Sequence, residues 1–363
     1  MTVITGSFPG ARNKVINGVR YVRAGRARSY FLSRMLFTLV AGRIASHLEK
    51  DLVVDDFSPF SPSFSFVNAE KPVLCVLRNF FREEVKKKHP FIGPAIQQIE
   101  LFCLRKYDNF LVFSPSMEKV LKRFLDTKKV KKKIFRLFRG IELSSYLSSY
   151  TEVKQRPAFR KTKQGKGDYV LFLGRVEMYQ KGIDILLEGY LLFRKNLQKQ
   201  GKPAPKLLIA GNASSQEQEK IQTLVKERGL ESDVCLVGRV EGQKKVRLLQ
   251  ESLFVVMPSR YESWGAVAIE AAAAGKAVIG SDIDGLRDAI VNNSTGLLFE
   301  LGKAIPASAQ HLSAKMLQLY NNPALRKELE QKAIKRSTDF DWSKVLKQQE
   351  ALYARVSRTS LRP

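Results

Sequence analysis

The sequence predicts an α/β fold made of two doubly wound, Rossmann-like domains joined by a linker. Short runs rich in Val, Ile, Leu and Phe alternate with helical stretches, which is typical of largely parallel sheets covered by helices. The alternation stops over residues 143–168, which are rich in Ser, Tyr, Lys, Gln and Gly, and it resumes at Tyr169. A chain of 363 residues is long enough to build two separate cores.

The first predicted domain covers residues 1–142 and carries six short apolar runs that we expect to be strands. These runs are Thr2–Thr5, Val19–Ala24, Leu52–Asp55, Pro72–Leu77, Phe110–Phe113 and Ile134–Phe138. Three helices are expected between them, over about Arg28–Glu49, Pro94–Tyr107 and Met117–Phe124. Asn17-Gly18 predicts a β-hairpin, because these residue types readily adopt the positive φ of a two-residue turn.

The second predicted domain covers residues 169–340 and shows the same alternation more regularly. The expected strands are Tyr169–Leu173, Lys206–Ala210, Val234–Val237, Leu253–Pro258 and Ala277–Gly280. The expected helices are Ile183–Leu197, Gln216–Arg228, Gln243–Gln250 and Ala266–Ala274. Residues 341–363 follow as a predicted terminal helix. Two such domains leave a cleft between them, and clefts of this kind are preferred ligand sites.

The balance of charge is strongly basic: 62 Lys and Arg against 35 Asp and Glu give a net charge of +27. Residues 1–150 hold 27 basic and 12 acidic side chains, so the first part is denser in positive charge. Such a field favours an anionic partner, which could be phosphate groups, acidic lipid headgroups or nucleic acid. We do not expect nucleic acid, because no aromatic–basic interleaving or nucleic-acid motif accompanies the charge.

The three cysteines, Cys75, Cys103 and Cys235, are far apart and form no CxxC pair. Each falls in an apolar stretch, so we expect each to be a small buried residue. The first thirty residues contain no apolar signal sequence, and the most apolar segment, residues 30–45, is interrupted by Arg34 and Arg43. These features predict a cytoplasmic protein.

The densest chemical signal lies in Pro258–Gly265 and the helix that follows it. A predicted strand ends at Pro258, and Gly265 opens the next helix after a short loop. The free backbone N–H groups of Trp264, Gly265 and Ala266 would then point out of the helix N-terminus. This arrangement is suited to a diphosphate, and Gly265 allows a close approach.

Two carboxylates, Glu262 and Glu270, lie eight residues apart around this helix start. Glu270 falls in an almost wholly apolar helix, where a charge needs partners. Ribose hydroxyls would serve, because one carboxylate can accept two hydrogen bonds from a diol. The alternative is that Glu270 pairs with a structural Arg or caps a neighbouring backbone.

A second signal is Gly174-Arg175, followed by Lys181-Gly182. Gly174 ends a predicted strand and a helix begins just after Gly182, so Arg175 and Lys181 lie on the loop at the carboxyl edge of the sheet. Open α/β sheets bind ligands at this edge. An Arg fork and a Lys point charge suit two phosphates, and they would stabilise the charge that develops on a phosphate leaving group.

With these motifs the chain resembles the retaining nucleotide-sugar glycosyltransferases of family 4, which have the two-domain GT-B fold. Members carry a strand ending in Gly-Arg, a Lys-Gly shortly after it, and Glu-x7-Glu within Pro-Ser-x-x-Glu-x-x-Gly. Gly174-Arg175, Lys181-Gly182 and Glu262 through Glu270 match these motifs. The other matching positions are Gly211, Gly238, Gly285 and Thr295–Leu298, and the resemblance is strong over roughly residues 169–345.

The resemblance implies that Arg175 and Lys181 bind the donor diphosphate, that Glu262 contacts the transferred sugar and that Glu270 contacts the ribose. We expect Glu262, Arg175 and Lys181 to carry the catalysis. The donor site is further expected to include Gly174, Gly211, Gly238, Arg239, Val240, Ser263, Trp264, Gly265 and Ala266, with Gly238 to Val240 flanking the base. The terminal helix of such enzymes packs back on the first domain.

No metal and no organic cofactor are expected, because members of the family need no metal. Asp282-Ile283-Asp284 spells a DxD sequence, which holds a metal ion in a different fold. Here it follows the last central strand, where the family has a loop, and we interpret it as a chance match.

The first domain departs from the family in three places. The strand Thr2–Thr5 begins almost at Met1, whereas members usually begin with a further strand, a Gly-rich turn and a helix; the N-terminal domain is therefore expected to be truncated, which would expose strand edges. Arg78 stands where relatives often carry a His, and it could bind an acidic acceptor or lie in solvent. His89 is expected in an exposed basic loop. Arg139-Gly140 replaces the common Asn-Gly at the linker.

The basic runs Lys86–Lys88 and Lys128–Lys133 have two interpretations. They could form a solvated face, or they could dock on an anionic membrane, where related enzymes often find lipid-linked acceptors. The sequence predicts a metal-independent hexosyltransferase that moves a sugar from a nucleotide-diphosphate donor to a saccharide or lipid-linked hydroxyl. It would work in cell-surface polysaccharide or glycolipid synthesis, in the cytoplasm or on the inner face of the membrane. The alternative is a non-catalytic or partner-dependent remnant that keeps donor binding.

Overall fold

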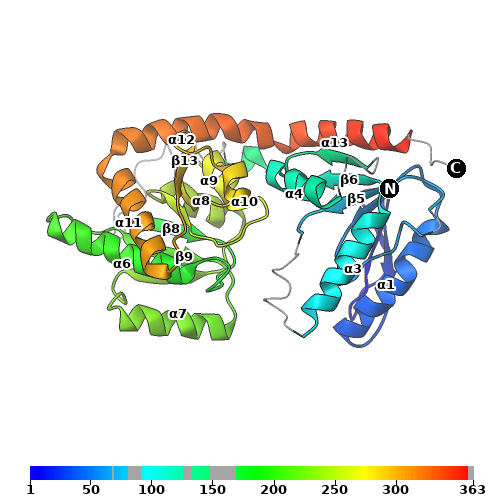
Figure 1. The fold of residues 1–363 in the computed structure, drawn as a ribbon, viewed down its shortest axis with the longest axis horizontal. Coiled ribbons are helices and arrows are strands. Elements are labelled where there is room, and N and C mark those ends of the chain that lie inside the picture. Colours follow the sequence, from blue (N-terminus) through cyan, green and yellow to red (C-terminus); the bar gives the residue numbers. More distant parts are fainter. Residues whose placement is uncertain (68, 81–90, 126–131, 147–168, 359–363) are drawn as a thin grey trace. The chain divides into compact units, whose positions relative to one another are not determined.

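The computed structural model describes residues 1–67, 69–80, 91–125, 132–146 and 169–358. The chain forms two compact units (Figure 1). Unit 1 comprises Met1–Phe138 together with Leu346–Pro363, and unit 2 comprises Arg139–Val345. Of the predicted linker 143–168, residues 143–146 are helical, and the remainder lies outside the described residues.

Unit 2 is built on a six-stranded sheet with the order β10-β9-β8-β11-β12-β13. All neighbouring strands pair in parallel, as predicted. The strands are β8 (Tyr169–Leu173), β9 (Lys206–Ala210), β10 (Val234–Gly238), β11 (Val255–Met257), β12 (Val278–Ser281) and β13 (Gly296–Phe299). Their carboxyl ends therefore meet at one edge of the sheet, which is the edge predicted to hold the ligand.

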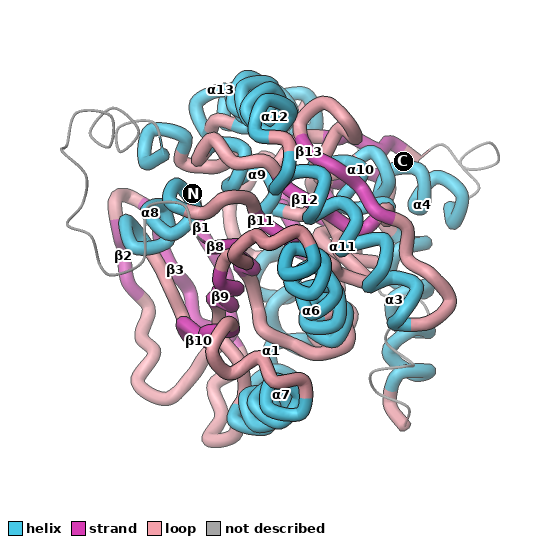
Figure 2. The backbone as a smooth tube through the Cα atoms, turned by 90° about the vertical axis from the view of Figure 1, so that its left-hand side faces the viewer, coloured by secondary structure: helices cyan, strands magenta, loops and turns pink. Residues whose placement is uncertain are grey.

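Helices cover both faces of this sheet. They are α6 (Ile183–Lys199), α7 (Ser215–Glu227), α8 (Gly242–Glu251), α9 (Ala266–Ala273), α10 (Asp284–Ala289), α11 (Ile305–Asn321) and α12 (Pro323–Ser337). Figure 2 shows β8, β9, β11 and β12 between α6 and α11 on one side and α8 and α9 on the other. The core between these layers consists of buried aliphatic and aromatic side chains such as Phe172, Leu186 and Val256. Strand β13 and helices α10 to α12 complete the unit beyond the elements that the sequence pattern predicted.

Unit 1 holds two sheets. The first has the order β1-β3-β2, and the second has the order β4-β5-β6-β7. The strands are β1 (Thr2–Gly6), β2 (Lys14–Ile16), β3 (Val19–Ala24), β4 (Val53–Asp56), β5 (Val73–Leu77), β6 (Asn109–Val112) and β7 (Lys133–Arg136). The predicted hairpin is confirmed: β2 and β3 pair antiparallel, with positive φ at Asn17 (50°) and Gly18 (76°). Within the described part of the unit, β1 and β4 each have a partner strand on one side only.

The helices of unit 1 are α1 (Tyr30–Ser46), α3 (Gly93–Lys106), α4 (Pro115–Leu125) and the end of α13 (Trp342–Ser357). A buried carboxylate, Asp55 of β4, accepts hydrogen bonds from Ser63 (2.6 Å), Ser65 (2.5 Å) and the Tyr107 hydroxyl (2.5 Å). These three donors satisfy a charge that would be costly to bury alone. Leu352 of α13 is buried together with residues of β5 and β6.

The prediction for the cysteines is confirmed for Cys75 and Cys103 and is wrong for Cys235. Burial raises the pKa of the Cys103 thiol to about 12, and burial near Asp55 raises the pKa of Cys75 as well. Cys235 is exposed because β10 is the edge strand of its sheet, so its side chains have a neighbouring strand on one side only. Across the described ranges, no helix is long and apolar enough to cross a membrane.

Candidate active site

Three glycine turns lie side by side at the carboxyl edge of the unit 2 sheet. Gly174 and Gly211 follow β8 and β9, and Gly238 is the last residue of β10. The Gly174 N–H donates to Ala210 O (3.0 Å), and the Gly211 N–H donates to Gly238 O (2.8 Å). A Cβ on Gly211 would lie 1.6 Å from Gly174 O, so no larger residue fits without moving the turn. These backbone hydrogen bonds between the predicted glycine turns fix the turns relative to one another.

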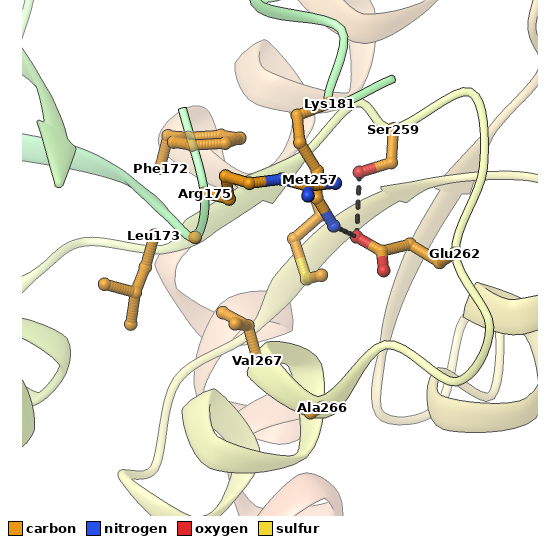
Figure 3. A pocket seen from close by; sticks show the side chains of 10 residues that line it. Phe172, Leu173, Arg175, Lys181, Met257, Ser259, Glu262, Ala266 and Val267 are labelled. Carbon is orange, nitrogen blue, oxygen red and sulfur yellow. Dashed lines mark hydrogen bonds and ion pairs between the residues drawn. The ribbon is translucent and has the colours of Figure 1, made fainter. Parts of the chain in front are cut away.

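A pocket of about 340 Å³ opens beside these turns (Figure 3). Its walls come from the end of β8, the loop before α6, the loop after β11 and the start of α9. The lining residues are Phe172, Leu173, Gly174, Arg175, Lys181, Met257, Ser259, Glu262, Ala266 and Val267. The two motifs that the sequence placed on separate loops, Arg175–Lys181 and Pro258–Gly265, therefore line one cavity.

Lys181 and Glu262 form an ion pair inside this pocket, with 2.5 Å between Nζ and Oε1. Their side chains are 16% and 13% exposed. The Ser259 hydroxyl donates to the same Oε1 at 3.0 Å, as Figure 3 shows. Within the described ranges the other carboxylate oxygen of Glu262 has no hydrogen-bond partner, so it can accept a bond from a ligand hydroxyl.

Arg175 projects into the same pocket from the β8–α6 loop (Figure 3). One guanidinium nitrogen donates to Gln180 Oε1 at 2.7 Å, which links the two ends of the β8–α6 loop. A guanidinium has five N–H donors, so this bond leaves several for an anion. Arg175 and Lys181 together make one wall of the pocket cationic.

A clamp that the sequence reasoning missed holds the two loops together. Arg260 makes a bidentate ion pair with Asp184 in the first turn of α6, at 2.8 and 2.9 Å. Its guanidinium also donates to the Tyr179 carbonyl (2.8 Å) and lies over the Tyr179 ring at 4.7 Å. Its backbone N–H donates to Gln180 O at 2.9 Å. Arg260 thus fixes the loop that carries Glu262 against the loop that carries Lys181.

Two glycines allow the close approach of these loops. A Cβ on Gly182, which has a φ of +66°, would lie 2.0 Å from Pro258 O. A Cβ on Gly285 would lie 1.9 Å from Glu262 O. Gly285 matched the family without an assigned role, and here it supports the backbone of the Glu262 loop.

Gly265 is the N-cap residue of helix α9, and its positive φ of 72° ends the preceding loop. Of the residues expected to present backbone N–H groups, Ala266 lines the pocket. The Trp264 side chain is only 3% exposed and packs edge-on against Phe340 at 5.7 Å, so it supports the loop from inside. Ser263 lies between Glu262 and Trp264 and is half-buried.

Glu270 lines a second pocket in unit 2, of about 400 Å³. The residues of this pocket are Gly140, Ile141, Glu142, Ser145, Tyr146, Gly242, Gln243, Lys245, Val246, Glu270 and Trp342. Glu270 pairs with Lys245 of α8, with 2.9 Å between Oε1 and Nζ. The carboxylate therefore has a structural partner, which is a Lys and not the Arg considered from the sequence. Burial, with the nearby Glu270 charge, raises the pKa of Tyr146.

The residues expected to flank a base are not among the lining residues of either pocket. Gly238 ends β10 with a φ of 76°. Arg239 pairs with Glu241 at 2.5 Å on the surface, and the Val240 side chain is 7% exposed. Their contact with a nucleotide stays a prediction.

Two further candidates, the DxD sequence and Arg78, have protein partners. Arg287 pairs with Asp282 (2.6 Å) and Asp284 (3.2 Å), so one guanidinium binds both carboxylates of the DxD sequence. No group of three metal-ligating side chains occurs in the part of the chain that the structure describes. Arg78 donates to both oxygens of Asp56 at 2.7 and 2.9 Å and is half-exposed. His89, Lys86–Lys88 and most of Lys128–Lys133 lie outside the described residues.

The part of the chain that contains this site matches a known protein family. The model of the family described as "Glycosyl transferases group 1" matches residues 154–336, half of the chain, including both loops of the first pocket. The chain belongs to this family. The two-unit α/β architecture is accordingly the GT-B glycosyltransferase fold.

Relatives of this chain match over the same half. A D-inositol 3-phosphate glycosyltransferase of Jonesia denitrificans is 31% identical over 194 residues, which cover 53% of this chain and 44% of that protein. A glycogen synthase of Mycobacterium tuberculosis is 30% identical over 207 residues, which cover 57% of this chain and 47% of the relative. The matching region thus spans about half the length of these relatives.

Solved structures resemble nearly the whole of this chain. Sucrose-phosphate synthase from Thermosynechococcus elongatus has a TM-score of 0.77 at 22% identity, covering 98% of this chain and 88% of that one. HepE of Anabaena, in complex with UDP and glucose, has a TM-score of 0.70 at 16% identity, covering 93% and 86%. At these identities the likeness shows the fold.

Proposed function

We propose that this group 1 glycosyltransferase is a retaining, family 4 type enzyme that takes a sugar from a nucleotide-diphosphate donor and transfers it to a hydroxyl. The observation that carries the proposal is the convergence of Arg175, Lys181 and Glu262 on one pocket at the carboxyl edge of the sheet. A cationic wall beside a carboxylate that keeps one open acceptor oxygen suits a diphosphate joined to a sugar.

In this proposal Arg175 and Lys181 bind the diphosphate, Glu262 binds the transferred sugar, and Glu270 accepts hydrogen bonds from the ribose. The bond between the anomeric carbon and the β-phosphate oxygen breaks, and its electron pair stays on that oxygen beside the two cations. The acceptor oxygen bonds to the anomeric carbon on the same face, and its proton passes to the departing phosphate. The proposal needs neither a metal ion nor an organic cofactor.

For the acceptor we propose a chemical class and not one compound. We propose a saccharide or lipid-linked hydroxyl, in cell-surface polysaccharide or glycolipid synthesis, with the enzyme in the cytoplasm or peripheral on an anionic membrane. The excess of positive charge supports this class of site. Nucleic acid is not a proposed partner.

A second candidate is a donor-binding protein without transferase activity of its own. It is favoured by Arg78, which stands where the resembled enzymes often carry a His and which is paired with Asp56. A permanently charged guanidinium cannot act as a base.

Calorimetry with UDP, GDP, ADP and dTDP tests the donor site. We expect at least one nucleotide to bind the wild type and to bind Glu270→Ala about tenfold or more weakly, the loss that corresponds to about 1.4 kcal/mol. Glu227→Ala is the matched control, because Glu227 is an exposed carboxylate of α7 in the same unit. Equal affinity of wild type and Glu270→Ala for all four nucleotides would sink the proposal. Binding without donor hydrolysis or transfer, even with membrane extract as acceptor, would favour the second candidate.

A further inference from the structure

Helix α1 of unit 1 carries large apolar side chains on its solvent side. Phe31, Met35 and Leu39 lie four residues apart on one stripe of the helix and are 73%, 51% and 71% exposed. Tyr30 and Leu32 widen the stripe at its start, with exposed fractions of 74% and 48%. A surface helix normally turns polar residues outward, so a row of this kind marks an interaction surface.

The opposite side of α1 is fixed against the strands by small residues. Ser33 Oγ is hydrogen-bonded to Ser7 O (2.7 Å) and Gly25 O (2.6 Å), and Ala41 is 3% exposed. A Cβ on Gly25 would lie 2.3 Å from Phe37 N, and one on Gly42 would lie 2.6 Å from Ser63 O. Residues 33, 37 and 41 therefore face inward, about half a turn from residues 31, 35 and 39. The helix cannot rotate its apolar stripe into the unit 1 core without breaking these contacts.

The segment that contains this stripe is strongly basic. Residues 1–48 contain eight basic side chains and no Asp or Glu, so none of the eight can pair within the segment. They are Arg12, Lys14, Arg20, Arg23, Arg26, Arg28, Arg34 and Arg43. Arg28, just before the N-cap Ser29, and Arg43, in the last turn of α1, are exposed at the two ends of the helix. The surface is thus apolar along its middle and cationic at its ends.

We propose that this face of α1, the stripe Phe31–Met35–Leu39 with Arg28 and Arg43, docks on the surface of an anionic lipid bilayer. The apolar side chains would enter the boundary between headgroups and acyl chains, and the arginines would bind lipid phosphates. The 17-residue helix is about 26 Å long and would lie in the membrane plane. Nucleic acid would bind the arginines, but it has no apolar layer into which the three apolar side chains could insert. The proposal goes beyond donor binding, and it locates the surface on α1 and not on the Lys runs 86–88 and 128–133.

Sedimentation of the full chain with lipid vesicles tests this surface. We expect vesicles of phosphatidylcholine with about 30% phosphatidylglycerol to bind the wild type at least tenfold more strongly than pure phosphatidylcholine, and we expect salt to weaken the binding. Phe31→Ser/Met35→Ser/Leu39→Ser should lose about tenfold or more of the binding to the mixed vesicles. Phe31→Leu/Leu39→Met should keep it, because the stripe stays apolar. Val291→Ser/Ile305→Ser, which alters two exposed apolar residues of unit 2, should also keep it.

Two results would overturn the proposal. One is unchanged binding of the triple Ser variant to the mixed vesicles. The other is a wild type that ignores phosphatidylglycerol but forms a dimer that the triple variant loses, because the stripe would then join two copies of the chain. Nucleotide affinity of the triple variant, measured by calorimetry, should equal that of the wild type. A failure of lipid binding can therefore be told apart from a failure of the proposed donor site.

Discussion

At the scale of single residues, Lys181 and Glu262 form an ion pair that places two opposite charges side by side in the first pocket. Each is largely buried, and each neutralises the other at 2.5 Å. A buried ion pair contributes little net stability, because desolvation offsets most of the attraction. Its use here is positional: it presents an ammonium group and a carboxylate side by side, where an anion and a hydroxyl group of one ligand could meet both. That geometry depends on the neighbouring loops, and the residue that fixes them is Arg260.

Arg260→Met should lower both stability and donor affinity. The substitution leaves the Asp184 carboxylate, 18% exposed, without its guanidinium, and we expect a loss of about 1–3 kcal/mol in the free energy of unfolding. Nucleotide affinity should fall about tenfold, because the Lys181 and Glu262 loops are no longer held together. Urea unfolding and calorimetry measure the two effects. Arg260→Lys should recover part of each.

Arg228→Met provides the comparison for this prediction. Arg228 pairs with Glu188 at 3.0 Å, with side chains 26% and 28% exposed, but it lies on the side of unit 2 formed by α6 and α7. We expect a similar loss of stability and an unchanged nucleotide affinity. If the two variants lost affinity equally, Arg260 would have only a general structural role.

At the scale of elements, the turn after β9 is the one of the three glycine turns that leaves no space for a side chain. A Cβ on Gly174 would meet only Phe172, at 3.9 Å, whereas a Cβ on Gly211 would lie 1.6 Å from Gly174 O, so there is no room for a side chain at Gly211. By contrast, Gly201, which follows α6 with a φ of +66°, has open space around it. The two positions separate the effect of positive φ from the effect of a steric clash.

Gly211→Ala should therefore cost far more than Gly201→Ala. The first places a Cβ 1.6 Å from a carbonyl oxygen, and we expect a loss of about 3 kcal/mol or more in the free energy of unfolding together with weaker nucleotide binding. The second imposes only the strain of positive φ, about 1–2 kcal/mol, with unchanged binding. Urea midpoints and calorimetry report both. Equal costs at the two positions would contradict the packed-turn interpretation.

The elements that the sequence predicted well are those with strong local signals. Asn17-Gly18 specified its turn, and the apolar runs ending in Gly174, Gly211 and Gly238 marked the sheet edge. Arg175, Lys181 and Glu262 could be placed in one pocket because parallel strands bring their carboxyl ends together. Arg260 and Lys245 were missed because their partners, Asp184 and Glu270, are 76 and 25 residues away. Spacing does not reveal which distant carboxylate a cation meets. The exposure of Cys235 was missed for a related reason, since strand order decides which strand is the edge.

At the scale of the whole molecule, the chain folds as two units with separate cores, and its last helix belongs to both. Trp342 at the start of α13 lies against Gly140 of unit 2, where a Cβ on Gly140 would meet the indole ring at 2.3 Å. Ten residues further on, Leu352 is 7% exposed among Leu74, Val76 and Leu111 of unit 1. The chain therefore returns to its first unit after completing the second, so residues near the C-terminus contribute to the stability of the β4-β5-β6-β7 sheet.

Leu352→Ala tests this return of the chain to its first unit. Removing a buried Leu side chain should cost about 2–3 kcal/mol, and the cost should appear in the opening free energies of the β5 and β6 amides. The β8 amides of unit 2 should keep their protection, because their core shares no side chain with this cluster. Leu346→Ala on the same helix is the control: its side chain is 49% exposed, so we expect a change within about 0.5 kcal/mol. Hydrogen exchange resolves the units separately, and an equal loss of protection in β5 and β8 would mean that the two cores open as one.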